Sequence, residues 1–239
     1  MRRVVISQSM YFPWVGLLEQ VRLGDVFVHY DDVQFSKGSF TNRVQVKTKH
    51  GRCWLTVPLR DHHLGQLIDE VRPDDRRDWR GQHRDMLRRA YENAPHLGDM
   101  LALVDKVFEQ PAGTLAELAK ASALALSDYF GLSSGRRFVD SRSLGVTGSG
   151  SQRVHDIVKA LEGNIYITGH GARNYLDHEM FERSGIAVRY MQYLCAPYSQ
   201  LHGKFNPFVT ALDLVANCGR DGARVIKSQC VGWRIFTNA

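Results

Sequence analysis

Residues 8–16 combine side chains that bind small molecules with a sharp change of backbone direction. The Gln8 amide offers both a donor and an acceptor, and the rings of Tyr11 and Trp14 could stack on a base or a sugar. A helix that begins just after a strand presents free N–H groups, and such groups bind phosphate or carboxylate. The segment therefore predicts a substrate-binding loop, with a proline turn held by aromatic packing as the alternative.

Two adjacent carboxylates, Asp31 and Asp32, follow a run of strand-forming residues, and Asn42 and Arg43 come shortly after them. Paired carboxylates can hold a divalent metal, orient ribose hydroxyls or act as a general base, and we assign the role of base to Asp32. The Arg43 guanidinium can grip phosphate or carboxylate with two parallel hydrogen bonds, while Asn42 can orient the substrate. A purely structural network of aspartate and arginine is an equally good interpretation.

A glycine-bearing loop, residues 169–175, is expected where a later strand turns into a helix. Its glycines permit close approach of the backbone to a ligand, and its arginine adds positive charge. The substrate-binding residues predicted here are Gly169, Gly171, Arg173 and Tyr175. We assign acid–base chemistry to His170, whose alternative role is that of an ordinary loop residue. The loop is neither a Walker A sequence nor a G-x-G-x-x-G fingerprint.

Further polar residues lie in the middle of the chain and towards its C-terminal end. His83 falls on the inward face of a predicted helix, where it is either an acid–base catalyst or a hydrogen-bonded core histidine. Tyr198, Gln200 and Lys204 lie on a predicted loop, and binding residues concentrate on loops. We predict that these three contact the substrate, with a surface loop that docks the C-terminal helix as the alternative.

The polar segments need a sheet to bring them together, because ligands of open α/β sheets bind beyond the carboxyl ends of parallel strands. Strand, turn, helix and strand follow one another within residues 4–32, which predicts a βαβ unit with a right-handed crossover. The second half of the chain repeats this rhythm. The predicted fold is α/β, with a mainly parallel sheet and flanking helices in a single domain over residues 1–239.

Two departures from this regular pattern are expected. An antiparallel strand excursion is predicted from three short segments, residues 33–36, 44–48 and 54–58. Apolar residues at helical spacing predict a mainly helical insertion over about residues 74–131. Within it, Thr114 and Glu117 have the spacing of a capping box.

The chain is basic, but its charge is dispersed. Lysine and arginine number 31 against 25 aspartates and glutamates, a net charge of +6 that can attract nucleic acid, anionic lipid or phosphorylated small molecules. The densest stretch, residues 72–89, interleaves aspartates with its arginines. This pattern favours a solvated helical surface over a patch that faces phosphate or RNA.

The cysteines and the N-terminus indicate a protein of a reducing compartment. Cys53, Cys195, Cys218 and Cys230 form no C-x-x-C pair, so we interpret them as buried free thiols rather than metal ligands. No stretch approaches the roughly 20 apolar residues of a membrane helix, and the apolar run near the N-terminus is too short for a secretory signal. We expect a cytoplasmic protein without membrane insertion and without a metal site.

The segments that carry these features, in this order, resemble the WbqC-like family of bacterial proteins. The matching stretches are ISQSMYFPWVG, DVFVHYDDVQFSKGSFTNRVQVKT, LTVPL, WRGQHRDMLRRAY, YITGHGARNYLD and YSQLHGKFNPFVTALDLVANCG. Together they cover nearly the whole chain. Two positions depart from the family's pattern: Ser9 stands where a proline is expected, and His170 lies in a loop that usually carries another residue.

The resemblance implies a biosynthetic enzyme of surface-polysaccharide synthesis, such as O-antigen synthesis, or of a natural-product pathway. It suggests transfer of an acyl or aminoacyl group onto the amine of a nucleotide-linked sugar or a similar small amine. Such a transferase needs a base, donors for an oxyanion and anchors for a nucleotide diphosphate. Asp32 or His83 would be the base, Gln8 and Asn42 would orient the substrate, and Arg43 would anchor it.

Two other functions stay open. The layout of residues 8–16 is similar to the first loop of nucleotidyltransferases and class I aminoacyl-tRNA synthetases, which suggests ATP-dependent ligation, although their H-x-G-H histidine pair is missing. The other is a non-catalytic binding protein of a biosynthetic complex that contacts tRNA through its basic surface. The residues name no cofactor, although a divalent cation could accompany a nucleotide.

Overall fold

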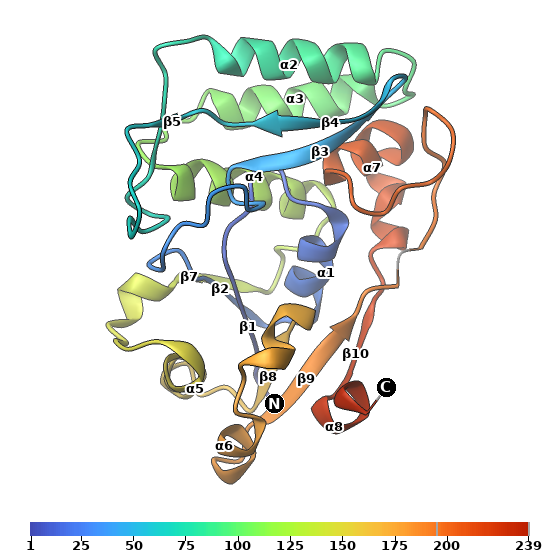
Figure 1. The fold of residues 1–239 in the computed structure, drawn as a ribbon. Coiled ribbons are helices and arrows are strands. Elements are labelled where there is room, and N and C mark those ends of the chain that lie inside the picture. The colour runs from blue at the N-terminus through green and yellow to red at the C-terminus, as the bar shows by residue number, and fades with distance from the viewer. Residues whose placement is uncertain (195, 239) are drawn as a thin grey trace.

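A six-stranded sheet forms the centre of the computed structural model, which describes residues 1–194 and 196–238 (Figure 1). Its strands lie in the order β10-β9-β8-β1-β2-β7, and all neighbours are parallel except β9 and β10. The strands are β1 (Arg3–Ser7), β2 (Val26–His29), β7 (Arg137–Asp140), β8 (Ile165–Thr168), β9 (Ala187–Gln192) and β10 (Gln229–Gly232). The predicted α/β fold with a mainly parallel sheet is confirmed.

The order of the strands places the end of β1 at the middle of the sheet. The chain passes from β1 through helix α1 (Val15–Leu23) to β2 on one side, and β8 later pairs with the other side of β1. Crossover helices cover both faces of such a sheet, which is why β2 and β8 are buried along their whole length. The carboxyl ends of these parallel strands gather at one edge, where open α/β sheets bind ligands.

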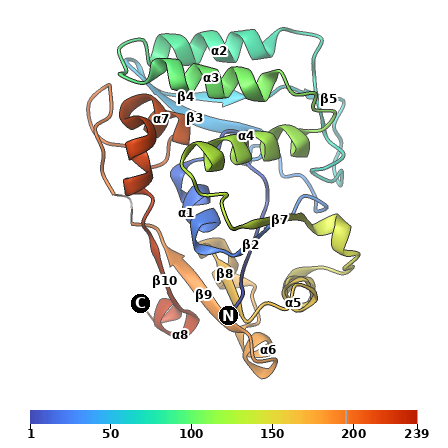
Figure 2. The same ribbon diagram turned by 180° about the vertical axis from the view of Figure 1, so that it is seen from behind.

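Alternate side chains of the sheet enter two hydrophobic clusters. On one face Val5 and Phe27 pack with α1 and α4 (Leu115–Tyr129). On the other face Val4 and Val28 pack with α5 (Gly150–Ala160) and α6 (His178–Arg183). Figure 2 shows α4 above β2 and β7, with α5 and α6 below them and α1 beside them. The sheet therefore lies between two helical layers.

Three more helices extend the layer that contains α4. They are α2 (Trp79–Ala90), α3 (Leu97–Phe108) and α7 (Ala211–Cys218). The predicted capping box begins α4: the Thr114 side chain accepts from the Glu117 N–H, and the Glu117 side chain returns to the Thr114 N–H. Buried residues of α2, α3 and α4 join the same cluster as α1, so the helical insertion shares the core of the sheet.

A β-hairpin of β3 (Arg43–Thr48) and β4 (Gly51–Thr56) forms the antiparallel excursion. A second, shorter pair consists of β5 (Leu59–Arg60) and β6 (Arg72–Pro73). The strand predicted over residues 33–36 is reduced to one bridge between Gln34 and Leu67. Its pairing is limited to the backbone bonds that join Val33 and Phe35 to residues 66–68.

Short helical segments complete the chain. They are the 3₁₀ helices η1 (Ser141–Leu144), η2 (His170–Asn174) and η3 (Gly219–Val225), and the terminal helix α8 (Trp233–Thr237). Among the described residues, no helix is both long enough and apolar enough to cross a bilayer. Three cysteines are free and half-buried: Cys53, Cys218 and Cys230. Cys195, the fourth predicted thiol, lies outside the described residues.

Candidate active site

Alternation at the end of β2 sends polar side chains to opposite faces of the sheet. His29 and Asp31 lie on the face covered by α4, whereas Tyr30 and Asp32 lie on the face covered by α5. The Asp31 carboxylate accepts a hydrogen bond from Ser9 in the loop after β1, and the Asp32 carboxylate forms an ion pair with Arg153 of α5. The two adjacent carboxylates therefore have separate partners and do not form one shared ligand site. In the described part of the chain, no cluster of three or more His, Cys, Asp or Glu side chains could hold a metal ion.

A buried relay joins the end of β1 to the end of β2. The Ser9 backbone N–H donates to Oδ1 of Asp31 at 2.8 Å, and the Ser9 hydroxyl donates to Oδ2 at 2.6 Å. The same hydroxyl oxygen lies 2.9 Å from Nδ1 of His29. Because Asp31 engages the hydroxyl proton, the network places the imidazole proton on Nδ1 and leaves Nε2 as an acceptor.

Burial sets the charges of the relay. It lowers the pKa of His29 to about 4. It also raises the pKa of Asp31 to about 6, although the hydrogen bonds from Ser9 act in the opposite direction. At neutral pH the imidazole is therefore neutral and the carboxylate is ionised. A proton taken up at Nε2 would be stabilised by Asp31 through Nδ1–H and the Ser9 hydroxyl.

His29 lines a hollow of about 410 Å³ at the carboxyl ends of β2 and β7, which we call the His29 hollow. Nε2 of His29 is buried and unpartnered among the described residues, and it points away from β1 because Nδ1 faces Ser9. Lys120 of α4 and Asp140 of β7 line the same hollow and form an ion pair of 2.8 Å. The hollow is thus lined by a neutral imidazole and by an ammonium group paired with a carboxylate.

A second hollow, of about 370 Å³, lies on the other face of the sheet where α5 begins, and we call it the Arg153 hollow. Its Asp32 carboxylate pairs with Arg153 and accepts from the Ser141 hydroxyl at 2.5 Å, so both carboxylate oxygens are occupied. Tyr30 and Tyr175 also line this hollow. Asp32, predicted as a base, is thus held in a buried ion pair.

His83, the second predicted catalytic residue, lies in the core between α2 and the hairpin. Its Nδ1 is 3.0 Å from the Tyr11 hydroxyl, and its Nε2 is 3.1 Å from the Thr56 carbonyl oxygen. The Trp79 ring packs beside it at 5.2 Å. Both nitrogens of His83 are engaged, and Tyr11 is fully buried, so these two side chains join α2 to the hairpin and the loop after β1.

Replacement of His83 by glutamine is expected to cost less stability in acid than at neutral pH. Burial lowers the pKa of His83 from 6.5 to about 4. The stability gained from the neutral imidazole is therefore complete above pH 6.5 and is lost as the pH falls towards 4. Between pH 7 and pH 5 the difference between the two proteins should shrink by about 2 kcal/mol. Urea unfolding at both pH values measures this, and a difference independent of pH would contradict it.

Trp14 packs against the protein instead of projecting from the loop. Its ring centre lies 4.7 Å from that of Tyr193 and 5.8 Å from that of Phe208. The indole also covers Gly16, where a Cβ would lie only 2.3 Å from a ring atom, so no larger residue fits there without a shift. Gln8 is half-buried just beyond the end of β1.

The C-terminal helix α8 contacts the loop of residues 169–175, most of which stays exposed. The His170 ring meets the Phe236 ring edge-on at 4.8 Å. Arg173 donates to the backbone oxygen of Thr237 at 2.9 Å. Tyr175, at the end of the loop, is 57% exposed and reaches the Arg153 hollow. The same loop holds Gly169 and Gly171.

Tyr198 and Gln200 tie their loop to the interior. The hydroxyls of Tyr198 and Tyr91 donate to the buried carboxylate of Asp213 in α7, at 2.8 and 3.0 Å. Gln200 accepts a hydrogen bond of 3.1 Å from Nζ of Lys47. This arrangement fits the alternative that the loop docks α7. The third predicted residue of the loop, Lys204, is exposed.

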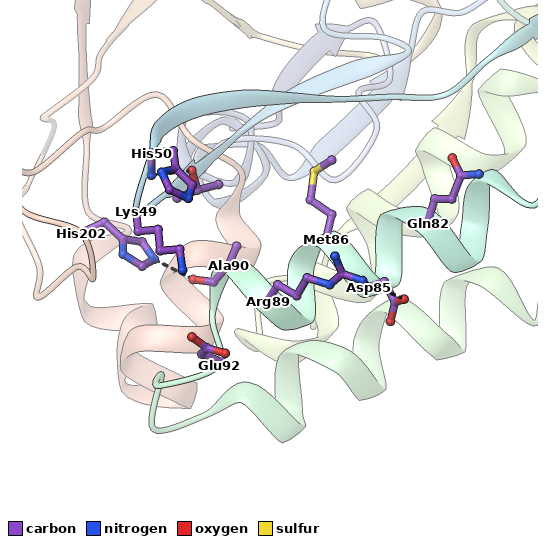
Figure 3. A pocket seen from close by; sticks show the side chains of 10 residues that line it. Lys49, His50, Gln82, Asp85, Met86, Arg89, Ala90, Glu92 and His202 are labelled. Atoms are coloured by element: carbon purple, nitrogen blue, oxygen red, sulfur yellow. Dashed lines mark hydrogen bonds and ion pairs between the residues drawn. The ribbon is translucent and has the colours of Figure 1, made fainter.

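A larger hollow, of about 690 Å³, lies between the hairpin turn and α2 (Figure 3). Lys49 and His50 approach it from the turn, and Arg89 and Glu92 from α2 and the residues after it. These four side chains are exposed, and the hollow is not at the carboxyl edge of the sheet. Volume alone therefore does not make it the reaction site.

Four residues of the relay and the His29 hollow are absent from the predicted site: Ser9, His29, Lys120 and Asp140. Alternation with Asp31 could have placed His29 on one face of the sheet from the sequence alone. Ser9 had one signal, since it stands where proline was expected, and proline would supply neither the N–H nor the hydroxyl of the relay. No sequence pattern indicated that Lys120 belongs to the site, because only the packing of α4 over β2 brings it there.

The fold and its two hollows define an α/β protein with polar groups at the carboxyl edge of a parallel sheet, the usual position of a substrate site. The model of the WbqC-like protein family matches residues 8–225, and the chain belongs to this family. It is 30% identical over 225 residues to the uncharacterized protein Rv1507c of Mycobacterium tuberculosis, covering 92% of this chain and 96% of that protein. No solved structure matches the chain.

Proposed function

We propose that this chain is a biosynthetic transferase that moves an acyl or aminoacyl group onto the amine of a nucleotide-linked sugar or a similar small molecule. One observation carries the proposal: the neutral imidazole of His29 lines a hollow with its Nε2 unpartnered, and a carboxylate supports it from behind through Ser9. A general base in this state suits an amine that must lose a proton as it is acylated.

The step assigned to His29 is proton removal during attack on the acyl group. The amine nitrogen forms a bond to the carbonyl carbon, and its surplus proton passes to Nε2 of His29. The carbonyl oxygen gains the negative charge, which the Lys120 ammonium on the same hollow can stabilise. The intermediate then collapses, the bond to the leaving group breaks, and the proton on Nε2 passes to that group.

The lining of the Arg153 hollow supports the proposal that the substrate receiving the acyl group is linked to a nucleotide. Residues 148–150 at the start of α5 line it, and free N–H groups at a helix start suit a phosphate. Tyr30 and Tyr175 offer flat rings for a base. Asp140 lines the His29 hollow, and its neighbour Ser141 bonds the ion pair of the Arg153 hollow. An extended substrate could therefore contact both hollows.

The test incubates the full chain with nucleoside-diphosphate-linked amino sugars and a panel of acyl-thioester and aminoacyl donors, with and without magnesium. We expect a mass gain at the sugar amine, and a higher Tm in the presence of the nucleotide-sugar. The absence of both effects across the panel would overturn the proposal. Release of pyrophosphate from ATP would support the ATP-dependent ligase instead.

A further inference from the structure

The β3–β4 hairpin and the residues before it carry positive charge without any acidic residue in the same segment. Residues 33–60 contain no aspartate or glutamate, and their six basic residues are Lys37, Arg43, Lys47, Lys49, Arg52 and Arg60. In the described part of the chain, the one carboxylate within ion-pair distance of these six is Asp61, 3.6 Å from Arg60. By contrast, five arginines within residues 72–89 pair with aspartates. Most arginines of this helical surface thus have a carboxylate partner, whereas most cations of the hairpin segment have none.

One face of the hairpin is open and carries aromatic rings among these cations. The strand register places Arg43, Gln45, Arg52 and Trp54 on the same face, while the apolar residues between them are directed into the core. Trp54 is 40% exposed, and the adjacent ring of Phe40, 5.9 Å away, is 43% exposed. Exposed apolar side chains that lie together in one patch mark binding surfaces more often than scattered single ones do.

The Arg43 guanidinium is fixed in position and has N–H groups that can bind an anion. Its guanidinium lies 4.2 Å over the Trp54 ring, and one of its terminal nitrogens is 3.1 Å from where a Cβ on Gly38 would lie. Its Nε is buried without a hydrogen-bond partner, as is Oδ1 of the neighbouring Asn42. Within the described residues no carboxylate pairs with this guanidinium, so its terminal N–H groups are free to bind a phosphate.

We propose that this face of the hairpin, formed by Phe40, Arg43, Gln45, Arg52 and Trp54, binds a single-stranded segment of RNA. Flat rings accept successive bases by stacking, and cations alongside them follow the phosphates. Single strands are required because bases in a duplex offer no free face, and loops and ends of RNA supply such bases. This interaction lies outside the proposed transfer reaction and does not depend on it.

An anionic membrane fits this face less well than RNA does. Proteins that bind a membrane surface usually project several apolar side chains together from one helix face. Here the Trp54 ring lies on β4 and the Phe40 ring on the loop before β3, and the guanidinium of Arg43 covers part of the Trp54 face. Stacking of a base beside that guanidinium uses both groups at once.

The test is fluorescence anisotropy of a labelled RNA strand of about 12 nucleotides, within the length range of single-strand sites, titrated with the full chain at physiological salt. Trp54→Ala should weaken binding about tenfold, and Trp54→Phe should restore most of the affinity, because a phenyl ring still stacks. Arg43→Gln should also weaken binding and reduce the slope of log Kd against log salt by about one. Arg76→Gln is the matched control, since Arg76 is exposed and lies outside the hairpin; its affinity should equal that of the wild type.

Several outcomes would overturn the proposal. Unchanged affinity in Trp54→Ala, or an equal loss in Arg76→Gln, would assign the binding to net charge. Tighter binding to duplex DNA, or to vesicles of phosphatidylcholine and phosphatidylserine, would identify a different partner. A wild-type Tm shows that each variant is folded. If Trp54→Ala does not fold, Arg43→Gln decides the question. An RNA affinity and a salt slope equal to those of Arg76→Gln would then overturn the proposal, and Trp54→Phe should still bind RNA with most of the wild-type affinity.

Discussion

Replacement of His29 by glutamine is expected to lower the rate of acyl transfer about 10²- to 10⁴-fold, the range that general acid–base catalysis contributes. The glutamine side chain can still bond the Ser9 hydroxyl, but it cannot take up a proton from the attacking amine. Substrate affinity should stay close to that of the wild type, because the change removes a proton acceptor and leaves both hollows in place. Single-turnover assays and equilibrium binding of the nucleotide-sugar separate these two effects.

The control for this prediction is His155→Gln. His155 is also a buried histidine, but both its ring nitrogens are bonded, to Asp156 and Ser184, and it lines neither hollow. Its replacement should leave turnover unchanged. A His29→Gln protein that keeps wild-type turnover would remove His29 from the mechanism.

The pH profile distinguishes catalysis by the relay from a structural role of its members. Burial raises the pKa of Asp31 to about 6, so its supporting charge is present above that pH and lost below it. The kcat/KM of the wild type should therefore fall as the pH drops through about 6. Ser9→Ala disconnects Asp31 from His29, and this acidic limb should disappear while the rate falls.

Replacement of Arg153 by methionine is expected to destabilise the protein by about 3–5 kcal/mol, the usual cost of removing one partner of a buried ion pair. The side chains of Arg153 and Asp32 are only 7% and 10% exposed, so the remaining carboxylate would stay buried without a counter-charge. Arg153 also donates to the carbonyl oxygen of Val146 at 3.1 Å, which holds the residues before α5. Urea unfolding at pH 7 measures the loss.

Arg142→Gln supplies the comparison with an exposed pair. Arg142 is 58% exposed and pairs with Asp69 at 2.6 Å, and such surface pairs contribute less than about 1 kcal/mol. Adding Asp32→Asn to the Arg153→Met protein should recover part of the lost stability, because a neutral amide costs less to bury than an unpaired charge. A loss in Arg153→Met no larger than that in Arg142→Gln would show that Asp32 is not buried in solution.

Local sequence patterns were sufficient for the elements of the sheet. The run of strand-forming residues at 26–28 predicted β2, and the segments before it predicted the βαβ unit. The same period of two continues through His29, Asp31 and Asp32, so it also contains the information that the two carboxylates face opposite sides. The prediction that Asp31 and Asp32 act as paired carboxylates did not take this alternation into account. Their separation needs no tertiary contact to explain it.

The partners of these side chains could not be predicted in the same way. Ser9 meets His29 because β1 and β2 are neighbours in the sheet, and Lys120 reaches the same hollow because α4 packs over β2. Two side chains of the loop at residues 169–175, His170 and Arg173, contact α8, which the sequence did not reveal. Each of these contacts depends on how separate elements pack.

By itself, the sequence determined the α/β fold and the approximate positions of the helices and strands, because hydrophobic periodicity and capping are properties of neighbouring residues. Its motifs were sufficient for the family. The tertiary structure alone decided which polar groups are engaged and which are free. It pairs Asp32 with Arg153 across 121 residues, encloses His83, and leaves Nε2 of His29 without a partner. Such choices follow from the packing of elements far apart in the chain, and a local period contains no information about that packing.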